Sequence, residues 1–164
     1  SMFEAMGKKE NIFHVGALGV GQTVKIVNQV IGGTSMAMIS EALCMGVKAG
    51  ADPEVMRQVV SVSSGNSTLF QMRVGDFLIK NEYDPGFMLD LMKKDMGLAV
   101  GLGKDMNLPM PIAAAAYQMF ALASRLGAGS LDFSAVSRGA EHLAGVRIAG
   151  DDTVGAGRGD GSSS

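Results

Sequence analysis

One long helical pattern constrains the fold more than any other feature of this sequence. From about residue 22 to about residue 49, apolar residues mostly recur at three- or four-residue steps, which is the period of one helix face. The positions are Val24, Val27, Ile31, Met38, Ala42 and Met45. At about 1.5 Å per residue, such a helix spans roughly 40 Å, which is more than a small domain needs for its own core. Within it, Gly32 and Gly33 allow a kink or the close approach of another helix.

Five further helical patterns follow, and local signals mark most of their ends. They cover about 53–61, 66–80, 88–104, 111–126 and 134–144. Asp52 and Pro53 are typical of a helix start, Gly127 is typical of a helix end, and Asp132 or Ser134 caps the last helix. We find no convincing strand, and the abundance of Ala and Met favours helices. We therefore predict an all-α bundle of about six helices with a long first helix.

Composition divides the chain into three parts and excludes several function classes. We expect an irregular segment over 1–14, a helical domain over 15–148 and a flexible Gly/Ser/Asp tail over 149–164. The net charge of −2 gives no reason to expect nucleic acid or an anionic membrane as a partner. Cys44 is the only cysteine and should pack in the core, and His14 and His142 lack ligand-like spacing, so we expect no metal site.

No run of 18 uncharged apolar residues appears, and the first residues do not read as a signal peptide. We expect a soluble intracellular protein. The expected location is the cytoplasm, or the mitochondrial matrix if the source is eukaryotic.

A lysine follows two glycines where the long helix is expected to begin. The segment reads Gly19-Val-Gly21-Gln-Thr-Val-Lys25-Ile-Val-Asn28. Glycines directly before a helix let a ligand approach the backbone, and the first helical N–H groups point toward it. We expect Lys25 in the first turn and Asn28 on nearly the same face. A cation at this helix end is locally unfavourable. A functional role for Lys25 is one interpretation, and a solvated lysine after a flexible loop is the other.

Lys25 can take part in proton transfer in either of two protonation states. The helix end contributes only about 0.3–1 kcal/mol, whereas holding an amine neutral near pH 7 requires roughly 4 kcal/mol. Desolvation must supply most of that difference, so a basic Lys25 works only when the site is closed against another surface. Alternatively, a protonated Lys25 acts as an acid toward a carbonyl oxygen.

A second segment places two lysines and an aspartate on one helix. We expect Lys93 to project to the solvated side. Lys94 flanks the apolar face, where its stem is sheltered while its amine reaches a cleft, and a plain surface lysine is the alternative. Asp95 falls inside the apolar stripe and needs a partner if it is buried. We expect that partner to be the end of a neighbouring helix.

Together the two segments resemble the C-terminal domain of the β-hydroxyacid dehydrogenase family, which includes 3-hydroxyisobutyrate dehydrogenase and tartronate semialdehyde reductase. The family pattern Gly-x-Gly-x-x-x-Lys-x-x-Asn is matched over 19–28. The family's Pro-Gly-Phe turn is matched at Pro85-Gly86-Phe87. Its Lys-Asp-Leu-x-Leu-Ala run is matched over 94–99, with Met96 in place of the usual leucine. The resemblance covers roughly residues 12 to 146.

The resemblance implies a fold like the C-terminal domain of 6-phosphogluconate dehydrogenase and assigns a role to each site residue. Lys25 is the implied acid/base that exchanges a proton with the substrate hydroxyl or carbonyl. Asn28, Gly21 and Phe87 are implied substrate-binding residues, while Lys94 and Phe87 border the nicotinamide. The implied reaction is the reversible oxidation of a short hydroxy acid with NAD or NADP.

The sequence lacks the part that would grip such a cofactor. No Gly-x-Gly-x-x-Gly turn follows a strand, and no acidic residue lies about 20 positions beyond one. We therefore expect NAD or NADP to be held mainly by an N-terminal Rossmann domain of a longer chain. Acid/base catalysis of about 10²–10⁴ achieves nothing without a hydride donor, so we expect no turnover from this chain alone.

Two readings without chemistry stand beside the enzymatic one. A helical dimerisation module would bury the stripe of the long helix against a partner. A binding domain that keeps only the fold is a third reading, against which the presence of both lysines argues. The enzymatic and dimerisation readings overlap, because the resemblance implies a domain that also builds oligomer interfaces. A monomer would leave part of the long helix's apolar face in water. We expect a homodimer or a higher homo-oligomer.

Overall fold

The computed structural model describes residues 13–150, and within this range the chain is all helical. The expectations for the first 12 residues and for 151–164 lie outside the described residues. Six α-helices and no strand occur between residues 13 and 150, with one isolated β-bridge between Met88 and Asp132. The prediction of an all-α bundle of about six helices, the first of them long, is confirmed.

The helices fall close to the predicted ranges. The α-helices are α2 (Val20–Lys48), α3 (Pro53–Ser61), α4 (Thr68–Arg73), α5 (Leu89–Asp105), α6 (Pro111–Ala123) and α7 (Ser137–Ala144). Two π-helical segments, η2 (Val74–Ile79) and η3 (Ser124–Ala128), extend α4 and α6, and a 3₁₀ turn, η4 (Phe133–Val136), precedes α7. The helix predicted over 66–80 is therefore an α-helix that widens into a π-helix.

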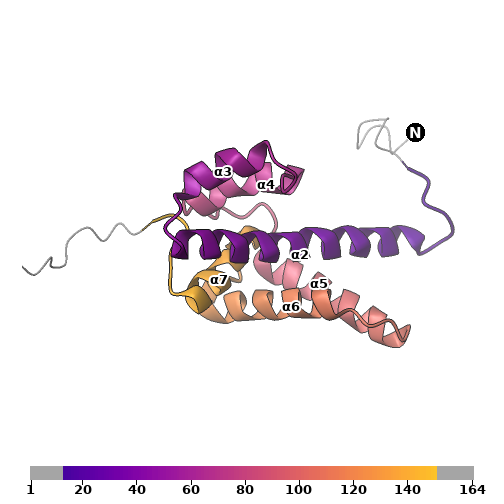
Figure 1. The fold of residues 1–164 in the computed structure, drawn as a ribbon. Coiled ribbons are helices and arrows are strands. Elements are labelled where there is room, and N and C mark those ends of the chain that lie inside the picture. Colours follow the sequence, from indigo (N-terminus) through magenta and orange to yellow (C-terminus); the bar gives the residue numbers. More distant parts are fainter. Residues whose placement is uncertain (1–12, 151–164) are drawn as a thin grey trace, which may run out of the picture.

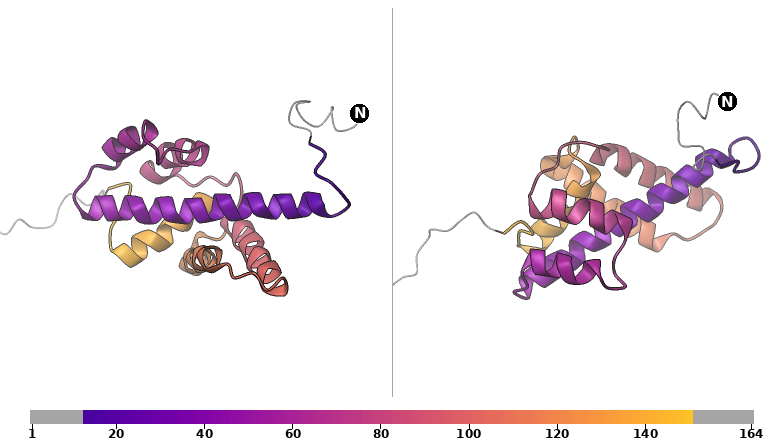
Figure 2. Two further views of the ribbon diagram at one scale, coloured as in Figure 1. Left: turned by 45° about the vertical axis from the view of Figure 1, so that its right-hand side comes forward. Right: turned by 90° about the horizontal axis from the view of Figure 1, so that it is seen from above.

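The long helix α2 is the axis of the molecule. Helices α3 and α4 lie on one side of it, and α5, α6 and α7 lie on the other (Figure 1). The N-terminal turns of α2 project beyond its neighbours (Figure 2), and residues 13–25 are all exposed. Helix α2 is long and apolar enough to cross a membrane, but the core helix of a soluble protein passes the same test.

Helix α2 buries one face and exposes another. Its buried residues are Gly33, Met36, Ala37, Ile39, Ser40, Leu43 and Cys44. The six apolar positions of the sequence pattern lie on the exposed face. The helix runs without interruption through Gly32 and Gly33, and Gly33 is buried against α5. The predicted core position of Cys44 is confirmed, since its exposed fraction is 2 %.

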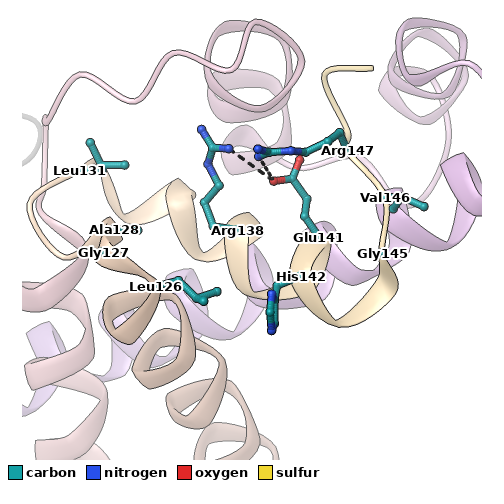
Figure 3. A pocket seen from close by; sticks show the side chains of 10 residues that line it. All are labelled: Leu126, Gly127, Ala128, Leu131, Arg138, Glu141, His142, Gly145, Val146 and Arg147. Atoms are coloured by element: carbon teal, nitrogen blue, oxygen red, sulfur yellow. Dashed lines mark hydrogen bonds and ion pairs between the residues drawn. The ribbon is translucent and has the colours of Figure 1, made fainter. Parts of the chain in front are cut away.

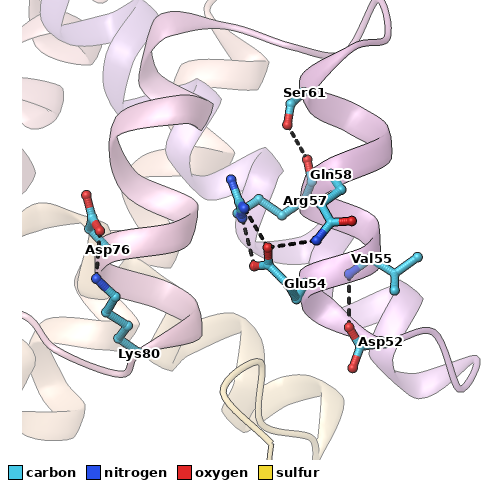
Figure 4. A network of polar contacts seen from close by, with 8 residues as sticks. All are labelled: Asp52, Glu54, Val55, Arg57, Gln58, Ser61, Asp76 and Lys80. Atoms are coloured by element: carbon cyan, nitrogen blue, oxygen red, sulfur yellow. Dashed lines mark hydrogen bonds and ion pairs between the residues drawn. The ribbon is translucent and has the colours of Figure 1, made fainter.

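Side-chain caps explain where the shorter helices begin. The Asp52 carboxylate accepts a hydrogen bond from the Val55 backbone N–H at 2.9 Å, which caps α3 as predicted (Figure 4). Within α3, the carboxylate of Glu54 accepts hydrogen bonds from Arg57 Nε at 2.8 Å and from Gln58. These bonds, with that from Arg57 first, lower the pKa of Glu54 to about 2. Nearby, Lys80, which directly follows η2, pairs with Asp76 of η2 (Figure 4).

The predicted helix end at Gly127 and the predicted cap before the last helix can both be located in the structure. Gly127 has a φ of +93°, the left-handed conformation typical of a helix end, and it lies within η3. The Asp132 side chain accepts from the Ser134 backbone N–H and from its hydroxyl, so Asp132 is the cap. The cap starts the 3₁₀ turn η4, which then leads into α7.

Candidate active site

A buried carboxylate on α5 contacts three side chains near the exposed end of α2. Asp95 is 6 % exposed. Its Oδ2 accepts a hydrogen bond from Gln29 Nε2 at 3.0 Å and lies 3.6 Å from Lys25 Nζ. Its Oδ1 lies 4.0 Å from Lys94 Nζ. The structure thus brings together the two lysines that the sequence singled out, and two amines around one carboxylate leave an excess of one positive charge.

Lys25 lies farther into its helix than the sequence indicated. Helix α2 begins at Val20 after Gly19, whose φ of +94° is left-handed. Lys25 is therefore in the second turn, and the prediction of the first turn is wrong. The helix dipole falls off within the first turn, so its effect on the Lys25 ammonium is weaker than expected. The amine is turned toward α5, where Asp95 attracts it.

Lys94 borders a hollow, but its stem is not sheltered, so its exposure is that of the alternative, a surface lysine. Its side chain is 65 % exposed and lines a hollow of about 730 Å³ between α2, α5 and Tyr117 of α6. Lys93 differs from the prediction of a solvated lysine. Its Nζ donates to Asp90 Oδ1 and to Ser124 Oγ, each at 2.7 Å, because η3, which continues α6, packs close enough to α5 to offer the serine.

The other predicted residues on α2 are open to solvent. Asn28 lies three residues after Lys25 and is exposed. Gly21 is also exposed and is the second residue of α2, not part of a loop before the helix. Gly21 lies four residues before Lys25 and Asn28 three residues after it, so both share nearly the same helix face as Lys25. The Lys25 side chain on that face is 55 % exposed.

Phe87 belongs to a separate cluster at the start of α5. Its ring packs edge-on against Phe133, with centroids 6.3 Å apart. Its backbone N–H donates to the buried Asp132 carboxylate at 3.3 Å. Arg73 Nε lies 3.6 Å from Asp132, and the guanidinium lies over the Phe133 ring. Among the contacts between described side chains, none joins Phe87 to Lys25 or Lys94.

Sequence reasoning assigned Asp95 only a structural partner and overlooked Gln29. The expected partner of Asp95 was the end of a neighbouring helix, whereas the observed partners are side chains from the second and third turns of α2. One signal was available: Gln29 follows Lys25 by four residues and so shares its helix face. Arg73 was also missed, and nothing in its local sequence marks it.

Comparison with known proteins identifies the family. A family model described as NAD-binding of NADP-dependent 3-hydroxyisobutyrate dehydrogenase matches residues 19–139, which include Lys25, Phe87, Lys94 and Asp95. This chain belongs to the 3-hydroxyisobutyrate dehydrogenase family. The resemblance to β-hydroxyacid dehydrogenases is therefore confirmed. Members of this family are NAD(P)-dependent oxidoreductases.

Two curated members of the 3-hydroxyisobutyrate dehydrogenase family illustrate the similarity. The 2-(hydroxymethyl)glutarate dehydrogenase of Eubacterium barkeri is 40 % identical over 141 residues, covering 86 % of this chain and 47 % of that protein. The 2-hydroxy-3-oxopropionate reductase of Escherichia coli is 36 % identical, covering 90 % of this chain and 50 % of that protein. The chain spans about half the length of the relatives that it matches.

A solved structure of the family has the same helical fold. The 3-hydroxyisobutyrate dehydrogenase of Salmonella typhimurium superposes with a TM-score of 0.74 at 35 % identity. The match covers 78 % of this chain and 45 % of that protein. The helices described here therefore correspond to the helical C-terminal domain of that dehydrogenase.

Proposed function

We propose that this chain is the catalytic, substrate-binding and oligomerisation part of an NAD(P)-dependent dehydrogenase that acts on a short β-hydroxy acid or its semialdehyde. One observation carries the proposal: Lys25 and Lys94, from different helices, converge on the carboxylate of Asp95. A lone exposed lysine needs no explanation, but two amines held at one carboxylate form a site that can bind an acidic substrate and move a proton.

In this proposal each residue has a distinct task. The Lys25 amine exchanges a proton with the substrate's hydroxyl or carbonyl oxygen. Asp95 and Gln29 restrict the position of that amine, because the carboxylate draws it toward α5. Asn28 and the backbone near Gly21 orient the substrate, and Phe87 forms an apolar wall for substrate and cofactor. Lys94 provides a positive charge at the rim of the neighbouring hollow.

The residues present fit one edge of a nicotinamide site. The apolar walls of the hollow next to Lys94 suit the flat nicotinamide ring. The excess positive charge of the two amines suits the carboxylate of the substrate instead. When bound, the nicotinamide supplies or accepts the hydride. No strand lies within residues 13–150, so no Rossmann turn is found there. We propose that an N-terminal Rossmann domain of the same full-length chain holds most of NAD or NADP and closes over Lys25.

This proposal predicts that the chain alone does not turn over. The Lys25 side chain is 55 % exposed, so water surrounds the amine until another surface covers it. Assays of NAD- and NADP-dependent oxidation with the purified chain should give rates equal to those of buffer. A measurable rate from the chain alone contradicts the proposal that a separate Rossmann domain must hold the cofactor.

The decisive experiment replaces Lys25 in the full-length enzyme. Lys25→Ala should lower kcat by about 10²–10⁴, the usual contribution of general acid/base catalysis. The matched control is Lys104→Ala, which removes an exposed lysine from the last turn of α5. A normal rate for Lys25→Ala, with Lys104→Ala also normal, removes Lys25 from the mechanism and leaves a helical module.

The exposed stripe of α2 favours a second role, which is assembly of two copies. Val24, Ile31, Met38 and Met45 recur every seven residues and are 47–71 % exposed. At 3.6 residues per turn they lie on the side of the helix opposite the buried Met36. Apolar side chains at seven-residue spacing form one row of the seam along which two helices pack. We therefore propose that a second copy of the chain covers this stripe.

The oligomeric state tests this role separately from catalysis. Ile31→Asp places a charge in the middle of the stripe and should convert the dimer into monomers, as measured by light scattering. Val62→Asp, at an 89 % exposed position beyond α3, is the control and should leave the dimer intact. A wild-type chain that is monomeric at high concentration rules out the stripe as the interface between copies.

A further inference from the structure

A second group of charged side chains lies far from Lys25, at the other end of α2. Lys48, in the last turn of α2, donates to the backbone oxygen of Ala144 at 2.7 Å and ties the two helix ends together. Between Lys25 and Lys48 the helix axis rises roughly 35 Å. Around α7, the side chains of Arg138, Glu141 and Arg147 converge (Figure 3). This cluster, which we call the arginine pocket, plays no part in the proposed dehydrogenase site.

The carboxylate in the arginine pocket cannot satisfy both guanidinium groups. Glu141 is 4 % exposed, and its Oε1 accepts a hydrogen bond from the Ile148 backbone N–H at 2.8 Å. Its Oε2 accepts from Arg147 Nη1 at 3.4 Å. Arg138 Nη1 lies 3.9 Å from the same oxygen, which is too far for a hydrogen bond. Among the described residues, Glu141 thus leaves most of the ten guanidinium N–H donors unused.

Packing holds Arg138 in place without using its donors. Its guanidinium carbon lies 5.1 Å from the centre of the Tyr83 ring, a cation–π contact. The Tyr83 hydroxyl is fixed in turn by a 2.8 Å hydrogen bond with Ser137. The Arg138 side chain is only 24 % exposed. A guanidinium stacked and positioned in this way loses little freedom when it binds a planar anion.

The arginine pocket is also hollow. It is an open depression of about 610 Å³, lined by Leu126, Gly127, Ala128, Leu131, Arg138, Glu141, His142, Gly145, Val146 and Arg147. Two arginines against one glutamate leave an excess of one positive charge. Hydrogen bonds from a guanidinium group to an anion are charge-assisted and therefore stronger than those between neutral groups.

We propose that the arginine pocket binds an anion through Arg138 and Arg147. The ligand group is a carboxylate or a phosphate, because both accept the paired N–H donors of a guanidinium. Two sources offer that chemistry: a free small molecule, or the acidic side chains of Asp151 and Asp152, which follow Arg147 closely in the sequence. The pocket and its residues are the same in both cases.

Titration of the full 164-residue chain with inorganic phosphate and with succinate tests the proposal. Binding is followed by the NMR signals of the arginine Nε–H groups, at constant ionic strength set with sodium chloride. We expect saturable shifts of Arg138 and Arg147, and at least tenfold weaker binding in Arg138→Gln and Arg147→Gln. Arg138→Lys keeps the charge but loses the paired donors, so it should also weaken binding. Lys104→Gln is the control and should bind like the wild type.

The variant Asp151→Asn/Asp152→Asn distinguishes the two sources. If the free anions bind the wild type, a small molecule is the occupant. If they bind only after the two aspartates are replaced, the chain's own carboxylates occupy the pocket. No saturable binding to either protein, or equal binding by Arg138→Gln and Arg147→Gln, overturns the proposal. Arg147 is half exposed, so its variant remains informative if Arg138→Gln fails to fold.

Discussion

Gly33 of α2 packs directly against Met96 of α5. A Cβ atom added at Gly33 would lie 2.9 Å from the Met96 sulfur and 3.3 Å from the Met92 sulfur. The missing side chain lets the two helices approach. That approach brings Gln29, one turn before Gly33, within 3.0 Å of Asp95. A glycine in the middle of the long helix therefore supports the position of the candidate site.

The neighbouring glycine provides a matched control for this contact. A Cβ at Gly32 meets nothing within 4 Å, so Gly32→Ala should raise the free energy of unfolding by about 0.8–1 kcal/mol through helix propensity. Gly33→Ala gains the same propensity but crowds Met96. It should be less stable than Gly32→Ala by about 1–3 kcal/mol, measured by urea unfolding. If the two variants have the same free energy of unfolding, α2 and α5 can move apart to accommodate the added methyl group without loss of stability.

The fold could be predicted because its signals are local. The Asp52 cap and the left-handed Gly127 lie in the sequence next to the helix ends that they determine. The spacing of residues 66–80 did not reveal that α4 widens into the π-helix η2. The apolar positions that the spacing singled out on α2 lie on its exposed face, whereas its buried face combines large apolar residues such as Met36 with small ones such as Gly33 and Ser40.

The candidate site could be predicted only in part, because its partners are distant in sequence. Spacing and resemblance pointed to Lys25 and Lys94, but neither reveals that Asp95 joins them. The first-turn placement of Lys25 was wrong because helix α2 begins at Val20, before the second glycine of the motif. A sequence shows which residues share a helix face, but the carboxylate that faces them comes from another helix.

A double-mutant cycle should measure the interaction energy between Gln29 and Asp95. The hydrogen bond from Gln29 to this buried carboxylate should give a coupling energy of about 1.5–3 kcal/mol, the usual value for bonds to charged groups. Unfolding of Gln29→Ala, Asp95→Ala and the double variant measures it. Coupling near zero contradicts the bond between them.

Lys25 should contribute much less to stability than Gln29. Its side chain is 55 % exposed, so water screens the ion pair with Asp95. Lys25→Met should change the free energy of unfolding by less than about 1 kcal/mol. A larger loss of stability means that a reduced rate in the full-length enzyme cannot be attributed to proton transfer alone.

Replacing Asp132 should be much more damaging than replacing an exposed aspartate. Asp132 is fully buried, and its carboxylate balances the charge of Arg73, whose side chain is 18 % exposed. Asp132→Asn removes that charge and should cost about 3 kcal/mol, because it leaves a guanidinium without its counter-ion. Asp84→Asn, at an exposed position, should stay within about 0.5 kcal/mol of the wild type. Similar unfolding midpoints for both variants contradict this role of Asp132.

Cys44 should be unreactive in the folded chain. Burial raises the pKa of its thiol from 9.0 to about 11, with smaller contributions from Glu141 and Glu41. The thiolate is the reactive form, and a rise of two pKa units lowers its population at pH 8 by about 100-fold. Labelling with a thiol reagent at pH 8 should therefore be at least about 100-fold slower in the folded chain than in urea. Cys44 is the only cysteine, so the signal comes from one group.

The same shift in the pKa of Cys44 gives the chain a pH-dependent stability with a definite sign. Below pH 9 the thiol is protonated in both states, so it adds no pH dependence. Between pH 9 and pH 11 the unfolded thiol ionises while the folded one stays protonated, so stability is lost as the pH rises. Cys44→Ala removes this contribution and should lose less stability than the wild type over that interval. Parallel losses in the two proteins, measured by urea unfolding at pH 8.5 and pH 10.5, contradict a raised pKa for this buried thiol.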